Sequence, residues 1–361
     1  MTKTDFSNLT FIRDFFQRFL PNSQVVALAI ILLVGSFLIY SLAGLLMPVF
    51  ASIVVAYLLE GLVQRAENRE VPRLIAVYVV FSGFLACLGF VLFVLIPVVS
   101  EQTVQLVQRI PEIVASAQLE IMRLPETHPE LISDTRIKEI MFAIQQDLLR
   151  YGQNIISGSA QSFAGLVAAI IYLFLVPMMV FFFLKDKTIL LSWLEQFLPN
   201  DRSLIMHVWQ EVDSQIANYI RGKFLEVFIL WAASYLTFSL LNLNYAMLLA
   251  LLMGLSVVIP YVGATLVTFP VLGVAYVQWG GGQGDEFMYV IVAYSIIQAI
   301  DGVMLVPLLF SEAVNLHPIA IIVAILFFGG LWGFWGVFFA IPLATLVKAV
   351  LTAWPKMTVA D

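Results

Sequence analysis

Long runs without a charged side chain are what most limits the folds open to this chain. One run covers residues 24–59, and another extends from Val227 to Gly284. A single helix over the first run would be roughly 54 Å long at about 1.5 Å per residue, whereas the hydrocarbon core of a bilayer is about 30 Å thick. We therefore expect two membrane passes in this run, with a turn near residues 43–48.

The composition supports a membrane protein. Of the 361 residues, 61% are hydrophobic and only 12% are charged, about half the charged fraction of an average soluble domain. The long segments have the length and apolarity of membrane helices, so the predicted fold class is an all-α polytopic membrane protein with the lipid bilayer as its surroundings.

Several classes of function are disfavoured by what the sequence lacks. The net charge is −6 and there is no basic stripe, which argues against nucleic-acid binding. There is no P-loop for ATP and no metalloprotease or hydrolase motif, so we predict neither ATP-driven transport by this chain alone nor an enzyme. The single cysteine, Cys87, and the three histidines lack metal-ligand spacing. We expect no metal site and no cofactor.

Charged and proline-containing segments divide the apolar runs into parts. The expected parts are a cytoplasmic interfacial helix (1–22), transmembrane segments 1–3 (23–100), an extracytoplasmic helical insert (101–160), transmembrane segment 4 (161–184), cytoplasmic amphipathic helices (185–222), a C-terminal transmembrane core (223–352) and a cytoplasmic tail (353–361). Lysine and arginine gather in the N-terminal segment, after the second and fourth spans, and near the C-terminus. By the positive-inside rule, both termini are expected in the cytoplasm.

Two apolar runs in the C-terminal core are interrupted by glycine and proline. The run 245–279 contains "IPYVG", with Pro260, Tyr261 and Gly263, and the run 313–350 contains "GGLWGFWG", with Gly333 and Gly336. Each is too long for one upright helix and too short for two comfortable ones. Each is therefore either one tilted or kinked helix with some interfacial chain, or a helical hairpin that enters and leaves on the same side. Paired interruptions of this kind point to a transporter's binding site.

Asp301 is a carboxylate inside the span that separates the two interrupted runs. Gln298 and Tyr294 lie on or near the same helical face, so polar groups cluster there. An intramembrane carboxylate costs roughly 2.5–3.5 kcal/mol on insertion scales and usually faces a polar interior. Two interpretations remain open: a group that binds a proton or a cation, or a structural hydrogen-bond partner.

Three other polar positions stand beside apolar runs. Asn315 and His317, in "NLHP", are candidates for capping the last apolar helix, with a substrate or proton role as the alternative. Glu226 lies one turn inside the fifth span, after "YIRGK", and is expected to form an interfacial ion pair with Arg221 or Lys223 that fixes the end of the helix.

Several of these motifs resemble one known family, the AI-2E (autoinducer-2 exporter-like) transporters. The resemblance rests on "VFFFLKDK", "NYIRGK" and "VVIPYVGA", and above all on the block from "QAIDGVMLVPLLF" to "IPLATLVKAV". It implies about eight membrane segments, an insert outside the membrane after the third, location in a bacterial inner membrane, and a homo-oligomer, with a pentamer expected. Many members have "EN" or similar polar residues where this chain has Asp301 and Gly302, so the carboxylate is a candidate subgroup trait.

Members of that family resemble exporters of autoinducer-2 or Na⁺(Li⁺)/H⁺ antiporters. The first hypothesis is therefore a secondary transporter of a small polar solute, with Asp301 as the site of the coupling proton. The second is cation/proton antiport through the same carboxylate. The third is a scaffold without transport activity that acts through the 101–160 insert.

Overall fold

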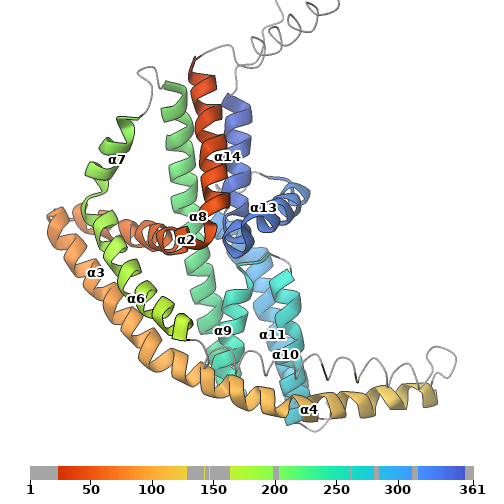
Figure 1. Cartoon of the computed structure of the whole chain (residues 1–361). Coiled ribbons are helices and arrows are strands. Elements are labelled where there is room, and N and C mark those ends of the chain that lie inside the picture. The colour runs from red at the N-terminus through yellow and green to blue at the C-terminus, as the bar shows by residue number, and fades with distance from the viewer. Residues whose placement is uncertain are drawn as a thin grey trace, which may run out of the picture. The chain divides into compact units, whose positions relative to one another are not determined.

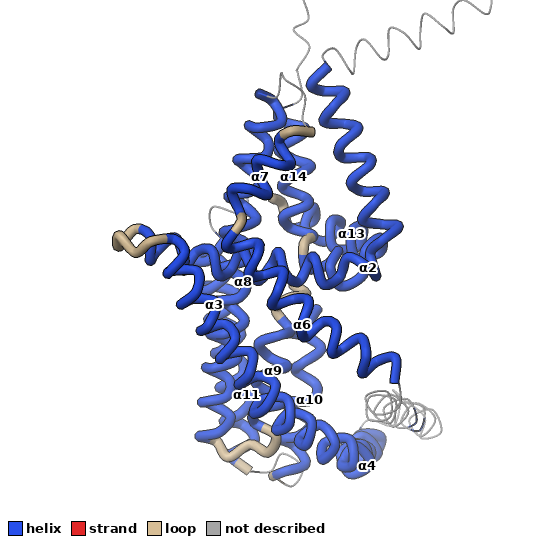
Figure 2. The backbone as a smooth tube through the Cα atoms, turned by 60° about the vertical axis from the view of Figure 1, so that its left-hand side comes forward, coloured by secondary structure: helices blue, strands red, loops and turns tan. Residues whose placement is uncertain are grey.

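The computed structural model describes residues 23–127, 142, 146, 163–197, 203–260, 262–279, 284–310 and 316–353. In this part of the chain all regular secondary structure is helical (Figures 1 and 2), as the predicted fold class requires. The helices are α2 (Ser23–Glu67), α3 (Arg73–Phe90), η1 (Val91–Leu95), α4 (Ile96–Thr127), α6 (Phe163–Lys185), α7 (Lys187–Glu195), α8 (Ser203–Leu240), α9 (Ala246–Ser256), α10 (Val262–Gln278), α11 (Asp285–Ile300), η2 (Asp301–Leu305), α12 (Val306–Phe310), α13 (Pro318–Phe338) and α14 (Ala340–Ala353).

Among the described residues, 5 helical segments are long and apolar enough to cross a membrane, or up to 6 if the bent pair Ala169–Lys185 and Lys187–Glu195 counts as one span. Three shorter apolar helices accompany them: Ala246–Ser256, Val262–Gln278 and Ala340–Val350. The prediction of an all-α polytopic membrane protein is confirmed.

Helix α2 corrects one detail of the sequence prediction. We expected a turn near residues 43–48, but the chain stays helical from Ser23 to Glu67 and bends instead (Figure 1). Pro48 lies inside the helix, where its ring would crowd the carbonyl of Gly44 and where it has no N–H to donate. The candidate span accordingly begins at Gly44. A proline can be accommodated by a bend in a continuous helix.

Helices α3, η1 and α4 follow one another without a break from Arg73 to Thr127. The boundary expected between residues 100 and 101 is therefore not the end of a helix. The side of the membrane on which the 101–160 insert lies stays a prediction, and most of its second half falls outside the described residues. The predicted interfacial helix at 1–22 and most of the tail also fall outside the described residues.

Both π-helical segments end two residues before a proline. Segment η1 (Val91–Leu95) precedes Pro97, and η2 (Asp301–Leu305) precedes Pro307. A proline removes one hydrogen bond from the helix, and a π-helical turn is one way to accommodate the freed backbone groups. The second of these segments begins at the carboxylate singled out in the sequence.

The chain forms two compact units. One unit combines residues 1–61, 178–220 and 312–361, and the other combines 62–177 and 221–311. The second unit contains the larger buried core, in which α8 residues from Leu230 onward, the pair α9 and α10, and α11 pack together (Figures 1 and 2). Gly254 of α9 permits close packing on α8, because a Cβ there would lie 2.7 Å from the carbonyl oxygen of Val227.

Helices α9 and α10 form an antiparallel hairpin within the second unit. Gln278, at the end of α10, accepts a hydrogen bond from the backbone N–H of Asn244 at 2.8 Å and donates one to the carbonyl oxygen of Asn242 at 2.7 Å. The two ends of the run 245–279 are therefore adjacent, and the loop that begins at residues 257–260 lies at the other end. At 11 residues, α9 reaches only about 16 Å, short of the thickness of a bilayer core. Of the two open interpretations, the structure supports the hairpin.

The N-terminus of α9 is held by a side chain from α4. The Tyr245 N-cap makes no side-chain capping bond, but the backbone N–H of Leu248 donates to Oε1 of Gln102 at 2.8 Å. Because the first N–H groups of a helix have no partner within it, this bond satisfies a donor that would otherwise be left over. Helix α4 thus ties the hairpin to the rest of its unit.

The hairpin makes a testable prediction. Cysteines at Asn244 and Gln278, in a chain with Cys87→Ser, should be joined within one molecule by a short bismaleimide reagent, because their residues already exchange a hydrogen bond. Peptide mass spectrometry would detect the link. A control pair at Asn244 and Val258 should not react together, since helix α9 separates these positions by about 16 Å. A link in the control pair and none in the test pair would contradict the antiparallel arrangement.

The second interrupted run belongs to the first unit and is also broken at glycine. Gly333, inside α13, has a φ of +58°, a backbone conformation that only glycine adopts readily. Three residues on, Gly336 faces the carbonyl oxygen of Phe328, which a Cβ would overlap. Tyr219 of α8 donates a hydrogen bond to the carbonyl oxygen of Phe338 at 2.9 Å, after the break. Predicted breaks in both runs are therefore present.

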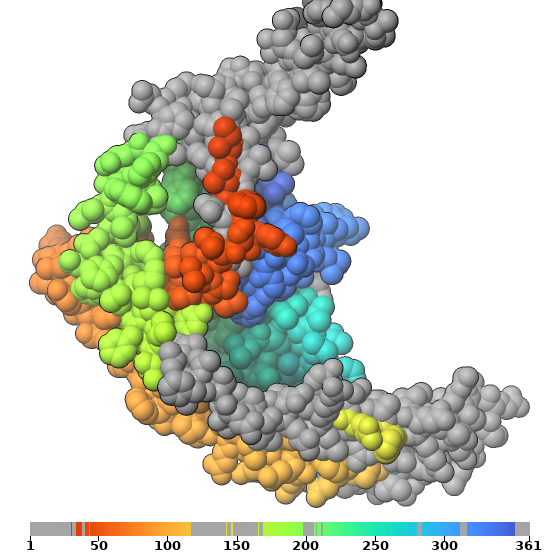
Figure 3. All heavy atoms as spheres, in the orientation of Figure 1, coloured from red at the N-terminus to blue at the C-terminus, as the bar shows by residue number. Residues whose placement is uncertain are grey.

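Helix α7 presents an apolar surface. Large side chains of α7 and the residues just after it are exposed, among them Ile189, Trp193 and Phe197, and the light-green atoms of this segment lie on the face seen in Figure 3. An exposed apolar face on a short helix beside lysines is typical of a helix in the membrane interface. The cytoplasmic amphipathic helices expected in 185–222 stay a prediction, and α8 runs through the expected boundary at residue 222.

Candidate functional site

Lys223 is a buried lysine in the middle of α8. Only 4% of its surface is exposed. Its Nζ forms an ion pair with Oε2 of Glu226 at 2.6 Å and donates a hydrogen bond to the carbonyl oxygen of Val257 at 3.0 Å. It also lies 5.0 Å from the centre of the Phe310 ring, within the range of a cation–π contact. An ammonium group removed from solvent thus has a carboxylate, a carbonyl and an aromatic ring around it.

Local sequence explains how this lysine becomes buried. Glu226 is three residues further along α8, on the same face of the helix. Gly222 brings α8 against α12, because a Cβ there would lie 2.9 Å from Cε1 of Phe310 and 3.2 Å from the carbonyl oxygen of Leu309. A larger residue would push α12 away from the lysine. Burying a charge is costly unless it is paired, and the Glu226 carboxylate supplies the pair.

The carbonyl that Lys223 contacts belongs to the hairpin loop, defined here as residues 257–260. Val258 and Ile259 donate their N–H groups back to α9, and Gly263 donates to the Ile259 carbonyl at 3.0 Å. The Val257 carbonyl accepts its hydrogen bond from Lys223 instead. Non-helical backbone in a membrane protein needs partners from protein or water, and here a buried cation is one of them.

Asp301 belongs to the same charged group. It opens η2, is 8% exposed, and its Oδ1 is buried without a hydrogen-bond partner in the part of the chain that the structure describes. It interacts electrostatically with Lys223 and with Glu226. We call Lys223, Glu226 and Asp301 the charged triad. It holds two carboxylates and one ammonium, so it carries one net negative charge when all three are ionised.

Tyr294 and Gln298 lie together, as predicted, and bind the hairpin. The Tyr294 hydroxyl donates to the carbonyl oxygen of Ala264 at 2.9 Å and lies 2.7 Å from Oγ1 of Thr268. Gln298 Nε2 donates to the Tyr294 hydroxyl at 3.1 Å and lies 3.5 Å from Sδ of Met253. These contacts attach α11 to both helices of the hairpin, one turn before the charged triad.

The remaining predicted site residues have different positions. Pro260 lies in the hairpin loop and accepts a hydrogen bond from the N–H of Val262 at 2.7 Å. Gly263 stands where the loop meets α10, and a Cβ there would overlap the carbonyl oxygen of Ser256. His317 caps α13, because its Nδ1 accepts a hydrogen bond from the N–H of Ile319 at 3.3 Å. Tyr261 and Asn315 lie outside the described residues.

Gly333 and Gly336 belong to the first unit, where they set the backbone of α13 in the second interrupted run. The predicted site residues that the second unit brings together are therefore Asp301, Gln298, Tyr294, Pro260 and Gly263.

The sequence prediction misplaced Lys223 and Glu226. We expected an interfacial ion pair at the end of a span. The pairing of Glu226 with Lys223 is confirmed, but both side chains are buried: 2% of the Glu226 side chain and 5% of the Lys223 side chain are exposed. Helix α8 begins at Ser203 and continues without interruption past them. Gly222 was the available signal. Glycine is unfavourable in the middle of a helix, so its presence there indicates a close contact with another element.

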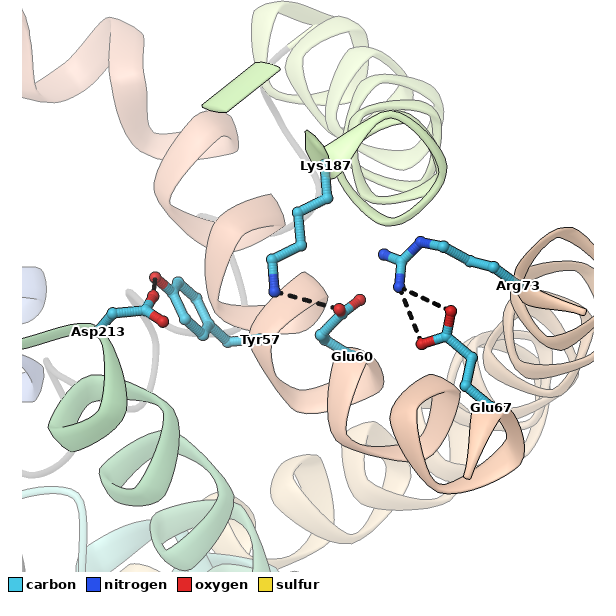
Figure 4. Close-up of polar contacts among 6 residues, drawn as sticks. All are labelled: Tyr57, Glu60, Glu67, Arg73, Lys187 and Asp213. Carbon is cyan, nitrogen blue, oxygen red and sulfur yellow. Dashed lines mark hydrogen bonds and ion pairs between the residues drawn. The ribbon is translucent and has the colours of Figure 1, made fainter. Parts of the chain in front are cut away.

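Helix α2 carries a second polar cluster, in the first unit. Tyr57 donates to Oδ1 of Asp213 at 2.5 Å, and Lys187 Nζ lies 3.1 Å from Oε1 of Glu60 (Figure 4). These contacts join α2 to α7 and to the first part of α8. The sequence offered no signal for them, because each pair is separated by more than a hundred residues.

In the second unit, Arg73 and Glu67 form an ion pair at 3.1 Å across the turn between α2 and α3 (Figure 4). Both side chains are about one-third exposed, so the pair contributes little to stability.

Among the described residues, no group of three or more His, Cys, Asp or Glu side chains has the geometry to hold a metal ion.

Comparison with known proteins identifies the family. Residues 26–356 match the model of a family described as "AI-2E family transporter". The chain belongs to the AI-2E transporter family. The resemblance inferred from the motifs is confirmed, and the match covers nearly the whole chain.

Relatives in this family are named for transport. The chain is 43% identical to "Putative permease PerM" of Escherichia coli (strain K12) over 353 residues, which are 98% of this chain and 99% of that protein. It is 23% identical to "Putative transport protein YueF" of Bacillus subtilis (strain 168), over 82% of this chain and 80% of that one, and 24% identical to "Putative transport protein YrrI" of the same organism, over 86% of each. This AI-2E member is thus a multi-pass membrane protein of a transport family.

Proposed function

We propose that this protein is a secondary transporter that moves a small polar solute, such as autoinducer-2, across a bacterial inner membrane, with a proton bound at Asp301 as the coupling ion. Both termini would lie in the cytoplasm, and the working form would be a homo-oligomer, with a pentamer as the expected state. No ATP and no nucleic acid would take part.

One observation carries the proposal. A buried carboxylate, one of whose oxygens has no hydrogen-bond partner among the described residues, lies in the same charged group as a lysine bound to the backbone of a helical hairpin. Intramembrane ionisable residues are costly and are usually functional. In secondary transporters, broken helices expose backbone carbonyls that take part in binding substrates or ions. Asp301 can gain or lose a proton, whereas the Val257 carbonyl and Lys223 can respond to its charge.

A second candidate function gains support from Glu226. Cation/proton antiport would be expected to use more than one intramembrane carboxylate, and the sequence alone suggested only Asp301. The buried Glu226 is a second carboxylate in the same group. Hard monovalent cations bind carboxylate and carbonyl oxygens, and the charged triad with the Val257 carbonyl offers both kinds.

Transport in proteoliposomes under an imposed pH gradient tests both candidates. We expect the wild type to accumulate radiolabelled autoinducer-2, or Na⁺ in the antiport case, and Asp301→Asn to lose gradient-driven accumulation by at least about tenfold, since an amide cannot exchange a proton. Counterflow without a gradient should persist in the variant, because binding of the solute does not require the proton to move.

The matched control is Asp285→Asn, the same substitution at an exposed position at the start of α11. It should transport as the wild type does. If Asp301→Asn accumulates solute and cation as well as the wild type, Asp301 has a structural role only and the coupling proposal is wrong.

A further inference from the structure

The charged triad has two acidic groups and one basic group. Because the basic group, Lys223, also binds the hairpin, the protonation of the acids can affect the hairpin. With both carboxylates ionised, Lys223 balances only one of them. A net charge that is shielded from water is costly. The neutral state of the triad is therefore the one with a proton on one carboxylate. Oε2 of Glu226 and Oδ1 of Asp301 are both buried without a hydrogen-bond partner among the described residues, but of the two carboxylates there only Glu226 forms an ion pair with the ammonium, at 2.6 Å. The proton belongs on Asp301 in the observed arrangement.

Lys223 has little freedom to serve both carboxylates at once. Its Nζ is held at 2.6 Å by Glu226 and at 3.0 Å by the Val257 carbonyl. A movement of Nζ toward Asp301 would lengthen one of these contacts. A bond between two charged groups is roughly twice as strong as one to a neutral carbonyl. The contact that is lost first is therefore the one to Val257.

We propose that Lys223 is a positioning residue that transmits the proton occupancy of Asp301 to the α9–α10 hairpin. While Asp301 carries a proton, Lys223 stays on Glu226 and on the Val257 carbonyl, and the hairpin loop is held against α8. When that proton passes to water, the carboxylate attracts the ammonium, the Val257 carbonyl loses its partner, and the loop is released. The inference rests on the proposed function in taking Asp301 as the proton-binding group.

Helix α8 contributes Lys223 and Glu226 to the triad and also carries Arg221, two residues before Lys223. The hairpin from Ala246 to Gln278 has no acidic, basic or histidine side chain, and α12 has none either. The titratable group that α11 turns toward the hairpin is Tyr294, whose hydroxyl is engaged by Ala264 and Gln298. Asp301 is thus the carboxylate of the triad that has no ion pair among the described residues.

The test measures access to the loop and requires no transported solute. Val258, beside Val257 in the loop, is 8% exposed, and a cysteine there in a Cys87→Ser chain would be the sole thiol. Its rate of reaction with N-ethylmaleimide is measured from acid to mildly alkaline pH, in Asp301 and Asp301→Asn chains. The ratio of the two rates cancels the pH dependence of the thiol itself.

We expect this ratio to be near one at acid pH and to rise by about fivefold or more at alkaline pH, the lower end of typical coupling between sites. Lys223→Arg should preserve the rise, because the charge remains. Lys223→Gln should remove it, since a neutral amide is not drawn to a carboxylate. Lys187→Gln, which breaks the partly exposed pair with Glu60, should leave it unchanged.

Two results would overturn the inference: a ratio that stays near one at every pH, or a rise in Lys223→Gln as large as in the wild type. The first comparison uses only the isosteric Asp301→Asn change, so it remains decisive if a lysine variant does not fold. A pH-dependent ratio together with unimpaired transport by Asp301→Asn would refute the coupling role alone, so the two failures are distinguishable.

Discussion

Replacing Lys223 with methionine is expected to lower the free energy of unfolding by roughly 3–5 kcal/mol, the usual cost of leaving a buried charge without its partner. The substitution keeps the length of the side chain but removes the ion pair with Glu226 and the hydrogen bond to the Val257 carbonyl. The measurement is an equilibrium denaturation titration of the purified protein in mixed micelles. The loss should exceed that of any other single lysine in the described part of the chain.

A double variant separates the charge from the packing. With Glu226→Met added to Lys223→Met, the unpaired carboxylate is gone, and we expect most of the lost stability to return, since a buried ion pair can often be replaced by apolar residues at little cost. Lys187→Met is the control, because its pair with Glu60 is partly exposed and should contribute at most about 1 kcal/mol. A double variant as unstable as the single one would show that Lys223 matters for packing and not for charge.

The second large effect is expected from Gly263→Ala. A Cβ at this position would overlap the carbonyl oxygen of Ser256, a backbone atom that cannot move without opening the hairpin. Forcing extra volume into a packed site costs about 3 kcal/mol at the upper end of the usual range. We therefore expect a clear fall in the thermal unfolding temperature in detergent, and reduced cross-linking between cysteines at Asn244 and Gln278.

Gly89→Ala provides the matched control for this substitution. Gly89 lies in α3, and no atom outside its own helix backbone lies within 4 Å of the place that a Cβ would take. Alanine is also the better helix former by about 0.5–1 kcal/mol. The unfolding temperature of this variant should be unchanged or slightly higher. Equal losses in the two variants would mean that the close approach of Gly263 to Ser256 has no energetic consequence.

The interrupted runs show how far a local pattern can be followed. Glycine and proline at 260–263 predicted a break, and the structure has one there. The pattern left open whether the chain then continues or reverses, because both use the same residues. The reversal is decided by contacts at the far ends, where Gln278 meets Asn242 and Asn244.

Helix α2 and the charged triad show where such reasoning stops. Length alone suggested a turn at 43–48, but a helix that bends at Pro48 satisfies the same limit without reversing. Asp301 was found because an intramembrane carboxylate is conspicuous in an apolar run. Lys223 and Glu226 were assigned to an interface because they stand at the edge of one, and their burial depends on Gly222 packing against α12.

The sequence by itself determined that this protein is helical and membrane-spanning, where its apolar runs are interrupted, and which family it belongs to, because these properties depend on local composition and on motifs. Only the tertiary structure decided that the run 245–279 is a hairpin and that Lys223, Glu226 and Asp301 form one charged group. The physical reason is that burial and ion pairing are set by contacts between residues distant in the chain. A local sequence pattern does not specify which helices pack against each other.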